Sequence, residues 1–372
     1  MRYCARCVLP DTRPDLEIQD DGICNACHSH ETKDVIDWTA RAADFDACVT
    51  SAKARSKGYD CLIPVSGGKD STWQVLKCLE YGMNPLCVTW RPPLRTTIGQ
   101  DNLDNLISLG VDHIDYSINP AVEKKFLLKS LERFGTTAIP MHLAIFYIPL
   151  TLAVRFDIPL VVFGENTAFE YGTKDPTRMG FAMDANWIKH SGVVHQTSAA
   201  DWVSDDLSEK ELTPYFGPSE TELRDKDVSA IFLGHYFQWD PDEVFKIARE
   251  RGFKTSTSGA RTGLYDYADI DDDLISTHHW MKWYKFGFTR LWDNLSLEIR
   301  NGRITRDEAI KIIAARGNET PEGDIAKLCE FLSIPTERFY KIAENFRDHG
   351  VWTQRDGVWK IDGFLIDDWE WE

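Results

Sequence analysis

The residues best suited to hold a charged ligand are six consecutive ones: Ser66, Gly67, Gly68, Lys69, Asp70 and Ser71. They follow an apolar run at 61–65 and precede a helix-like run at 72–79. A buried strand, a small-residue turn and a helix start together form an anion site, because glycines let backbone N–H groups approach a ligand and the helix adds its positive end. The serines supply hydroxyls, Lys69 a charge, and Asp70 a carboxylate that could also meet Mg²⁺.

The spacing of this loop is not that of Walker A, which needs four residues between its glycines and then Gly-Lys-Ser/Thr. It resembles the PP-loop (SGGxDS) of the ATP pyrophosphatases. That resemblance implies ATP held by its pyrophosphate, adenylation of a carbonyl-type oxygen, and displacement of AMP by a nitrogen or sulfur nucleophile. The alternative is an ordinary glycine-rich turn between a strand and a helix.

Two pairs of cysteines near the N-terminus have the spacing of a metal site. Cys4, Cys7, Cys24 and Cys27 form the pattern C-x2-C-x16-C-x2-C. Each C-x2-C pair puts two thiolates on one side of a tetrahedral ion, so the pattern predicts structural zinc with no open position. An iron–sulfur cluster uses the same ligands and is the alternative. Disulfides are the weaker explanation because nothing indicates secretion.

Further polar residues follow other predicted strands. Gly164, Glu165 and Asn166 lie just beyond a run at 160–163, where a carboxylate and an amide could orient ribose, an α-phosphate or an acceptor. A polar turn is the equal alternative. Thr89 and Trp90 end the run at 85–90, an edge that commonly contacts adenine, although Trp90 could also be a core residue.

Cations gather among aromatic residues at 282–290, in a chain that is otherwise acidic. We expect Lys285 and Arg290 to face phosphates or a substrate anion and to stabilise charge in the transition state. The alternative is that they extend to solvent from a packed aromatic face. The pairs His278–His279 and His190–His195 show no clear metal spacing, and we interpret them as structural or substrate-facing.

The elements that must position these residues alternate along the chain. Apolar runs at 61–65, 85–90, 113–116, 160–163 and 230–233 are separated by helical patterns. This order predicts an α/β fold with a doubly wound parallel five-stranded sheet, whose ligands bind at the carboxyl ends of the strands. The predicted organisation is a Cys4 zinc module at 1–34, a linking helix at 35–57, an ATP-binding domain at 58–252 with an insertion at about 165–229, and a C-terminal helical substrate region with a tail at 253–372.

Composition limits the classes of partner. The 372 residues include 42 Lys and Arg against 59 Asp and Glu, which gives a net charge of −17. That balance argues against a large nucleic-acid footprint, which depends on clustered cations. We expect no membrane partner and a cytoplasmic protein, because no uninterrupted apolar stretch approaches membrane-spanning length and no apolar signal region is evident.

Taken together, the Cys4 pattern, SGGKDS, Gly164-Glu165-Asn166, the segment 284–290 (YKFGFTR) and the segment 298–306 (EIRNGRITR) resemble the N-acetyl sugar amidotransferases of the PP-loop superfamily over nearly the whole chain. These enzymes act in bacterial surface-polysaccharide (LPS O-antigen) and nonulosonic-acid biosynthesis. The resemblance implies conversion of an acetamido group on a sugar, possibly UDP- or CMP-linked, to an acetamidino group with ATP and Mg²⁺. Ammonia would come from a separate glutaminase and synthase pair.

Two other functions stay open from the sequence. A tRNA sulfur-transfer enzyme can also join a PP-loop to C-x2-C knuckles, but the charge and the lack of an evident active cysteine count against it. A non-catalytic nucleotide-binding scaffold would bind ATP without splitting it. The chain shows no glutaminase nucleophile motif, so nitrogen as the nucleophile would require ammonia from outside.

Overall fold

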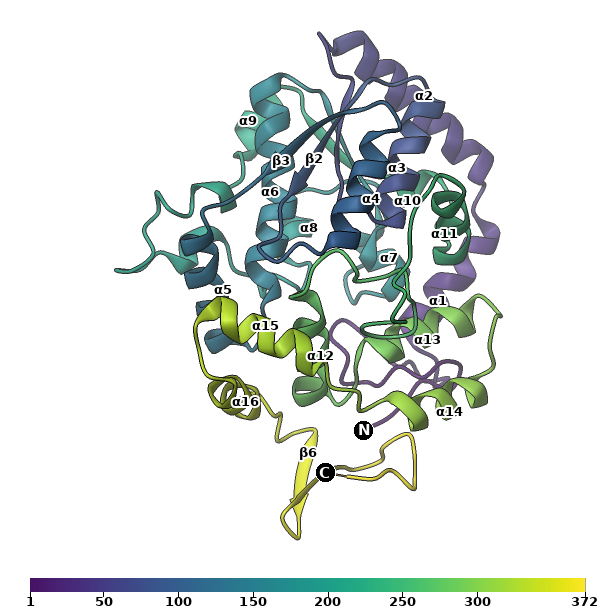
Figure 1. Ribbon diagram of the computed structural model, residues 1–372. Coiled ribbons are helices and arrows are strands. Elements are labelled where there is room, and N and C mark those ends of the chain that lie inside the picture. Colours follow the sequence, from purple (N-terminus) through teal and green to yellow (C-terminus); the bar gives the residue numbers. More distant parts are fainter. Residues whose placement is uncertain (372) are drawn as a thin grey trace.

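A five-stranded parallel sheet forms the centre of the computed structural model, which describes residues 1–371 (Figure 1). Its strand order is β3-β2-β1-β4-β5 and every neighbouring pair is parallel. The strands are β1 (Cys61–Pro64), β2 (Pro85–Trp90), β3 (Asp112–Tyr116), β4 (Leu160–Phe163) and β5 (Ser229–Phe232). The predicted α/β fold with a doubly wound five-stranded sheet is therefore confirmed.

The direction of winding reverses between β1 and β4. From β1 the chain adds β2 and β3 on one side, and it then returns to add β4 and β5 on the other. In such sheets the turns that leave the two central strands diverge and open a crevice at the carboxyl edge. The turn after β1 is the SGGKDS loop, and the turn after β4 contains Gly164, Glu165 and Asn166.

Helices α5 (Pro120–Phe134) and α6 (Ala138–Phe156) cover one face of the sheet. Phe126 and Leu143 are fully buried there against Leu62 of β1. The sequence led us to expect no apolar stretch near membrane-spanning length. Helix α6 corrects this expectation, because its 19 residues are long and apolar enough to cross a membrane by length and composition. His142 and Arg155 interrupt the apolar run in the sequence without ending the helix. Half of the helix window is buried inside the protein, as expected for a core helix.

The other face of the sheet is covered by helices from four parts of the chain. Phe45, Val75, Leu103 and Val244 pack there in one cluster with strand residues such as Ile63. The helices on this face are α2 (Trp38–Arg55), α3 (Lys69–Glu80), α4 (Thr97–Ile107), α10 (Leu233–Tyr236) and α11 (Pro241–Glu250). With α5 and α6 opposite, strands β1, β2, β4 and β5 are largely buried on both faces, which explains their continuous apolar runs, whereas the edge strand β3 is partly exposed.

The predicted insertion between β4 and β5 consists of short helices and turns. They are α7 (Thr167–Tyr171), η2 (Pro176–Met179), α8 (Ala185–Lys189), η3 (Ala199–Trp202), η4 (Thr213–Tyr215) and α9 (Glu220–Asp225). Trp187, Trp202 and Tyr215 from this segment pack into the same cluster as α5 and α6.

After α11 the chain leaves the sheet and forms a helical region at its carboxyl edge, below the sheet in Figure 1. Its elements are α12 (Ile275–Phe286), α13 (Arg290–Arg300), α14 (Arg306–Arg316), α15 (Glu322–Leu332), α16 (Thr336–Asn345), β6 (Trp352–Arg355) and β7 (Val358–Ile361). Thr305 and Glu308 make the capping box that starts α14. Asp356 and Gly357, both with positive φ, turn the predicted hairpin.

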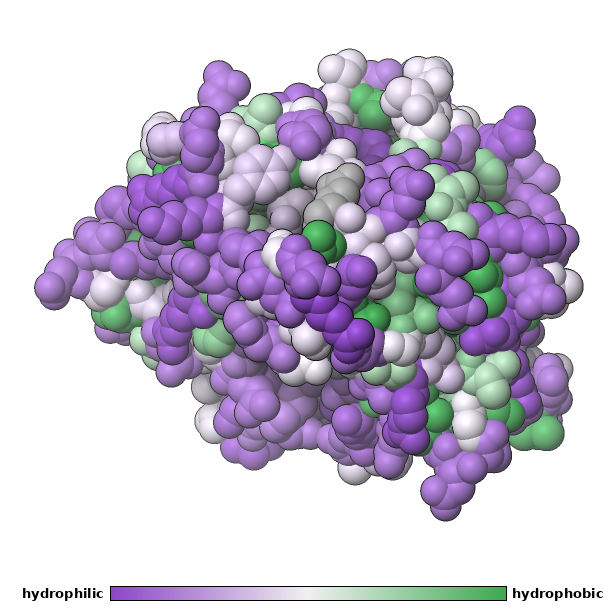
Figure 2. Space-filling model, turned by 90° about the horizontal axis from the view of Figure 1, so that it is seen from below, coloured by the Kyte–Doolittle hydropathy of each residue, from purple (hydrophilic) through white to green (hydrophobic). Residues whose placement is uncertain are grey.

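The cysteine-bearing N-terminus, with α1 (Asn25–Glu31) and η1 (Thr32–Val35), packs on this C-terminal region. Leu9 and Leu16 share a buried cluster with Leu291, Trp292 and Leu295 of α13. Seen from below the view of Figure 1, the surface is mostly hydrophilic with scattered hydrophobic residues (Figure 2). The domain boundaries given above stay predictions.

Candidate functional site

The SGGKDS loop has a backbone that only glycine can supply at its centre. Gly67 has φ +89°, and a Cβ atom there would lie 2.6 Å from the backbone nitrogen of Leu103 in α4. Gly68 is the N-cap of α3, and its N–H donates to Ser66 Oγ at 3.2 Å. The N–H of Ser66 in turn donates to Ser71 Oγ at 3.2 Å. Both hydroxyls therefore lie within the turn, at the positive end of a helix.

Lys69 and Asp70 are held by aromatic residues from distant segments. Lys69 is 6% exposed, and its Nζ donates to Asp70 Oδ1 at 2.7 Å. The same Nζ lies 5.2 Å from the ring centre of Trp239 and 5.7 Å from that of Tyr267. Trp239 Nε1 donates to Asp70 Oδ1 at 2.9 Å. These contacts hold the Lys69 cation and the Asp70 carboxylate in position at the end of the loop.

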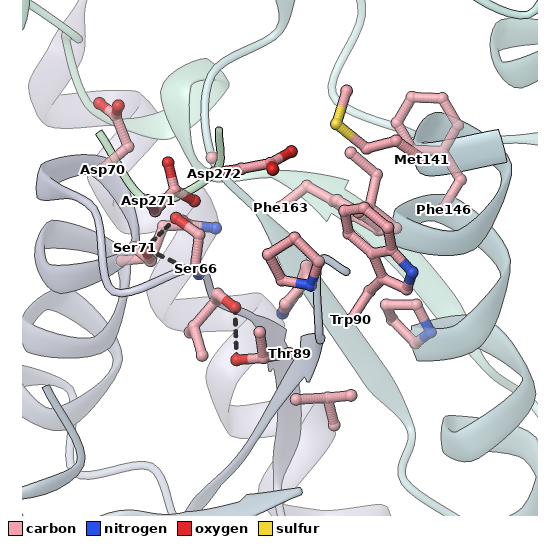
Figure 3. Close-up of a pocket in the computed structure, with 18 of the residues that line it drawn as sticks. Ser66, Asp70, Ser71, Thr89, Trp90, Met141, Phe146, Phe163, Asp271 and Asp272 are labelled. Atoms are coloured by element: carbon pink, nitrogen blue, oxygen red, sulfur yellow. Dashed lines mark hydrogen bonds between the residues drawn. The ribbon is translucent and has the colours of Figure 1, made fainter. Parts of the chain in front are cut away.

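A cavity of about 350 Å³, which we call the strand-edge cavity, opens at the carboxyl ends of β1, β2 and β4. The two sides of the cavity differ in polarity (Figure 3). Asp70, Asp271 and Asp272 lie on one side, and apolar side chains including Met141 and Phe163 lie on the other. An apolar slot beside a polar loop suits a planar base attached to a charged group.

Thr89 and Trp90 both line the strand-edge cavity. Thr89 Oγ1 donates to the carbonyl oxygen of Val65 at 2.7 Å, which joins the ends of β1 and β2. Trp90 Nε1 donates to Glu123 Oε1 at 2.9 Å. Trp90 therefore lies at the cavity wall and anchors a buried carboxylate as well.

A second cavity, of about 180 Å³, lies on the other side of the SGGKDS turn, and we call it the loop cavity. Gly67, Gly68, Lys69, Tyr171 and Arg290 line it. Five residues line both cavities: Ser66, Asp70, Glu165, Asp269 and Asp271. The two cavities therefore adjoin along a row of carboxylates, and a single elongated ligand can occupy both.

Carboxylates dominate this border. Burial, with a smaller effect of Asp70, raises the pKa of Glu165 to about 7, and burial raises the pKa of Asp271 to about 6. Such groups are carboxylates whose negative charge is incompletely balanced by the protein. Oxygen donors of this kind fit Mg²⁺ bound together with substrate phosphates. Asp70 lies at the same border, where Lys69 Nζ donates to both of its carboxylate oxygens.

Arg290, at the first position of α13, is a second cation that lines the loop cavity. Its guanidinium lies 5.7 Å from the ring centre of Tyr171, and its Nε lies 3.9 Å from Asp269 Oδ2. This Nε atom has no hydrogen-bond partner among residues 1–371. Arg290 thus lines the loop cavity together with Lys69, and its buried Nε retains unused hydrogen-bonding capacity.

Two of the predicted residues lie elsewhere. Lys285 Nζ donates to the carbonyl oxygen of Phe134 at 2.9 Å, and Lys285 lines neither of the two cavities among the described residues. Asn166 is 3% exposed and caps α7, and its amide donates to the carbonyl oxygens of Arg178 and Gly180. Gly164 and Glu165 line the strand-edge cavity as expected for site residues, while Asn166 shapes the turn behind them.

Several residues of the site had no local motif that could predict them. Tyr171, Trp239 and Tyr267 contact the loop residues or Arg290 from three separate segments. Asp269 and Asp271 belong to an acidic run at 269–273, the one signal in the sequence that could have identified them. His279, 7% exposed, has Nε2 3.4 Å from Asp269 Oδ2.

The four N-terminal cysteines converge as their spacing predicts. All are buried, and their sulfur atoms lie within 4.8 Å of one another. The Cys4–Cys27 and Cys7–Cys24 sulfur distances are 3.9 and 3.7 Å. Tetrahedral bonds of about 2.3 Å from one ion to sulfur place the sulfurs about 3.8 Å apart. The four thiolates therefore fit a single tetrahedral metal ion.

Comparison with known proteins gives one family match. Residues 261–363 match the family described as "LPS biosynthesis protein WbpG-like, C-terminal domain". This region includes α12, α13 and Arg290, and the match supports the resemblance to the PP-loop amidotransferases. A search of curated proteins found no match.

Two solved structures show weak likeness. A "predicted subunit of tRNA methyltransferase" from Methanocaldococcus jannaschii has 13% identity and a TM-score of 0.30, covering 64% of this chain and 91% of its own. The U34-tRNA thiolase NcsA from Methanococcus maripaludis, solved with its 4Fe–4S cluster, has 13% identity and a TM-score of 0.32, covering 90% and 89%.

Proposed function

We propose that this chain, which carries a WbpG-like C-terminal domain at residues 261–363, is an ATP-dependent amidotransferase acting on an acetamido sugar. It would convert the acetamido group to an acetamidino group and release AMP and pyrophosphate. The observation that carries the proposal is the position of Arg290. This residue of the C-terminal domain lines the same cavity as Gly67, Gly68 and Lys69 of the SGGKDS loop.

ATP would span the two adjoining cavities. The adenosine part would occupy the strand-edge cavity beside Thr89 and Trp90, against its apolar wall. The β- and γ-phosphates would lie in the turn, bound by the hydroxyls of Ser66 and Ser71 and by the N–H groups of Gly67 and Gly68, with Lys69 neutralising them. Mg²⁺, held by Asp70 and neighbouring carboxylates, would balance phosphate charge when bound.

The chemistry requires activation of an amide, which is a poor electrophile. The amide oxygen would attack the α-phosphorus and form an O-adenylyl imidate, while pyrophosphate leaves into the SGGKDS turn. Ammonia would then add to the imidate carbon, the added nitrogen would lose a proton, and AMP would depart with the original amide oxygen. Positioning and charge stabilisation by Lys69 and Arg290 would supply most of the catalysis, with Glu165 orienting the reacting end.

Ammonia would come from a separate glutaminase and synthase pair. This part of the proposal rests on the family resemblance and on the lack of a glutaminase nucleophile motif in this sequence. Co-purification of a glutamine-dependent partner, with glutamine replacing ammonium in the assay, would support it.

The metal at Cys4, Cys7, Cys24 and Cys27 would be structural zinc. A cluster with a separate iron atom for each cysteine needs its sulfurs spread farther apart than one ion does, whereas these sulfurs have the spacing of single-ion ligands. Four thiolates leave no open position for a substrate.

The test is an assay of the purified protein with Mg–ATP, ammonium chloride and a panel of acetamido and diacetamido sugars, free and nucleotide-linked. The proposal expects AMP and pyrophosphate only when sugar and ammonium are both present, with a product in which NH replaces O. Lys69→Ala should lose this release while keeping the fold. AMP formation with bulk tRNA and a sulfur source, and with no sugar, would instead indicate the thiolation enzyme.

A further inference from the structure

Tyr171, the last residue of α7, carries a hydroxyl group that the protein itself leaves unpaired. The side chain is partly exposed, and of the two cavities at the SGGKDS loop it lines only the loop cavity. Its hydroxyl forms no hydrogen bond with any of residues 1–371. It is also not one of the fully enclosed polar atoms that lack a partner, so it remains accessible. This hydroxyl is therefore available to a ligand in the loop cavity.

Two arginine side chains hold the aromatic ring of Tyr171. The guanidinium carbon of Arg290 lies 5.7 Å from the ring centre, and that of Arg13 lies 5.8 Å from it. Both contacts are favourable because the face of an aromatic ring attracts cations. Arg13 also donates from a terminal nitrogen to the carbonyl oxygen of Tyr171 at 3.2 Å. Tyr171 and Arg290 thus line the loop cavity in contact with each other.

The preceding residue, Glu170, anchors α7 to its surroundings. Glu170 Oε2 accepts from Lys33 Nζ at 2.6 Å, and both side chains are almost completely buried. The carbonyl oxygen of Glu170 accepts from Arg300 of α13 at 3.1 Å. Loss of either partner of a buried ion pair is strongly destabilising. Helix α7 is therefore held firmly by the N-terminal module and by α13, and it presents Tyr171 from a rigid support.

The Tyr171 hydroxyl keeps its proton at neutral pH. Burial raises the pKa of Tyr171 to about 12, although the Arg290 cation favours the ionised form. The carboxylates of Glu165 and Asp70 add to the rise. The phenol is therefore a neutral group that can donate a hydrogen bond to an anion.

The loop cavity has few unused donors for an anion that gains charge during a reaction. Lys69 Nζ is shared with both carboxylate oxygens of Asp70, at 2.7 and 2.8 Å. Arg290 supplies a second cation, and Tyr171 supplies a neutral donor beside it. When ATP is cleaved between its α- and β-phosphates, charge develops on the pyrophosphate. Fixed donors directed at such developing charge lower the barrier to reaction.

We propose that Tyr171 is a further catalytic residue, and that its hydroxyl donates a hydrogen bond to the pyrophosphate as it leaves ATP. This inference rests on the proposed function only in requiring that ATP is cleaved between its α- and β-phosphates. In that step the oxygen between the two phosphorus atoms keeps the electron pair of the broken bond. Tyr171 keeps its proton, and Arg290 stabilises the same negative charge.

Tyr171→Phe tests this role because it removes the hydroxyl and keeps the ring that contacts the two arginines. Single-turnover rates of AMP formation, with Mg²⁺, sugar and ammonium, are compared for ATP and its β,γ-methylene and β,γ-difluoromethylene analogues. We expect the variant to be about 10- to 100-fold slower with ATP, since a hydrogen bond to a charged group contributes roughly that factor. The loss should be largest with the methylene analogue, whose leaving group is the most basic, and smallest with the difluoromethylene analogue. A loss of equal size with all three nucleotides, or no loss, would overturn the inference.

Two further measurements separate catalysis from structure. Binding of the uncleavable α,β-methylene analogue of ATP with Mg²⁺ should change by less than about threefold in Tyr171→Phe, because the charge has not yet developed. A large loss of this binding would indicate a structural role and overturn the inference. Tyr147→Phe is the matched control, since Tyr147 is a partly buried tyrosine of α6 that lines neither cavity. An equal loss of rate in Tyr147→Phe would also overturn the inference.

The same assay distinguishes failure of this inference from failure of the proposed function. Normal turnover by the unaltered chain together with normal rates in Tyr171→Phe overturns the inference alone. If the unaltered chain releases no AMP with any sugar, the proposed function is overturned, and the role of Tyr171 falls with it.

Discussion

Arg13 of the cysteine-bearing module donates from Nε to Asp293 Oδ1 of α13 at 2.8 Å, and Asp293 is 1% exposed. Helix α13 begins with Arg290. Arg306 Nε also donates to the carbonyl oxygen of Cys7 at 3.0 Å. The Arg13–Asp293 ion pair joins the N-terminal module to the helix that begins with Arg290, and Arg306 joins it to α14, so we expect metal binding to influence the geometry of the loop cavity.

Loss of the metal should therefore reduce both stability and activity. Cys24→Ser should abolish binding of the metal, lower the melting temperature and lower AMP formation, because the module has little core of its own without an ion. Elemental analysis should find about one zinc per chain in the unaltered protein. Cys48→Ser, at a half-buried cysteine outside the cluster, is the control and should keep the metal. Iron in place of zinc would contradict the assignment.

The turn at Gly67 should not tolerate a side chain. Gly67→Ala introduces a Cβ atom 2.6 Å from the Leu103 nitrogen at φ +89°, so the loop or α4 must shift. We expect ATP affinity to fall by at least about tenfold, because several phosphate-binding groups move together. Gly58→Ala is the matched control, since a Cβ there meets nothing within 4 Å. Equilibrium binding of a labelled ATP analogue measures both, and equal loss in the two variants would contradict a specific role for Gly67.

The two predicted cations should behave differently. Arg290→Gln should lower the rate of AMP formation by about a hundredfold while ATP binding changes little, because removing a donor to developing charge costs roughly this much. Lys285 lies against the Phe134 carbonyl and lines neither ATP cavity. We therefore expect Lys285→Gln to keep the rate within about threefold. Steady-state kinetics of both variants measure the rate of AMP formation. A loss of rate greater than about threefold in Lys285→Gln would support the role in charge stabilisation predicted for Lys285.

Glu123 should make stability depend on pH. Burial raises the pKa of its carboxyl to about 7, although the Trp90 indole N–H favours the charged form. Between the unfolded pKa of about 4.3 and about 7, the folded state binds more protons than the unfolded state, so this group's contribution to stability falls as pH rises through that window. Glu123→Gln keeps an acceptor for Trp90 and removes the titration.

Urea denaturation at pH 5 and pH 8 measures this effect. The unaltered chain should lose on the order of 3 kcal/mol more stability than Glu123→Gln over that interval, from about 1.4 kcal/mol per pKa unit. Parallel pH profiles for the two proteins would show that Glu123 titrates as an ordinary exposed carboxyl does.

Local patterns predicted most of the fold. The run 85–90 became β2 with the expected bounds, because a short apolar segment between turn signals has few alternatives in a sheet buried on both faces. The SGGKDS turn and the cysteines were recognisable because their chemistry depends on spacing along the chain. Tyr171, Trp239 and Asp269 were not, because they reach the loop only through long-range packing. Lys285 and Arg290 looked equivalent in sequence, but the end of α12 and the start of α13 point them at different surroundings.

The most direct test of the central claim follows the amide oxygen. With an acceptor whose acetamido carbonyl carries ¹⁸O, attack of that oxygen on the α-phosphorus leaves one ¹⁸O atom in each AMP released. Mass spectrometry of AMP, after turnover with Mg–ATP and ammonium, reads this out. We predict labelled AMP and unlabelled pyrophosphate. Unlabelled AMP, or ADP with labelled inorganic phosphate, would contradict the O-adenylyl route and with it the proposed role of the SGGKDS loop.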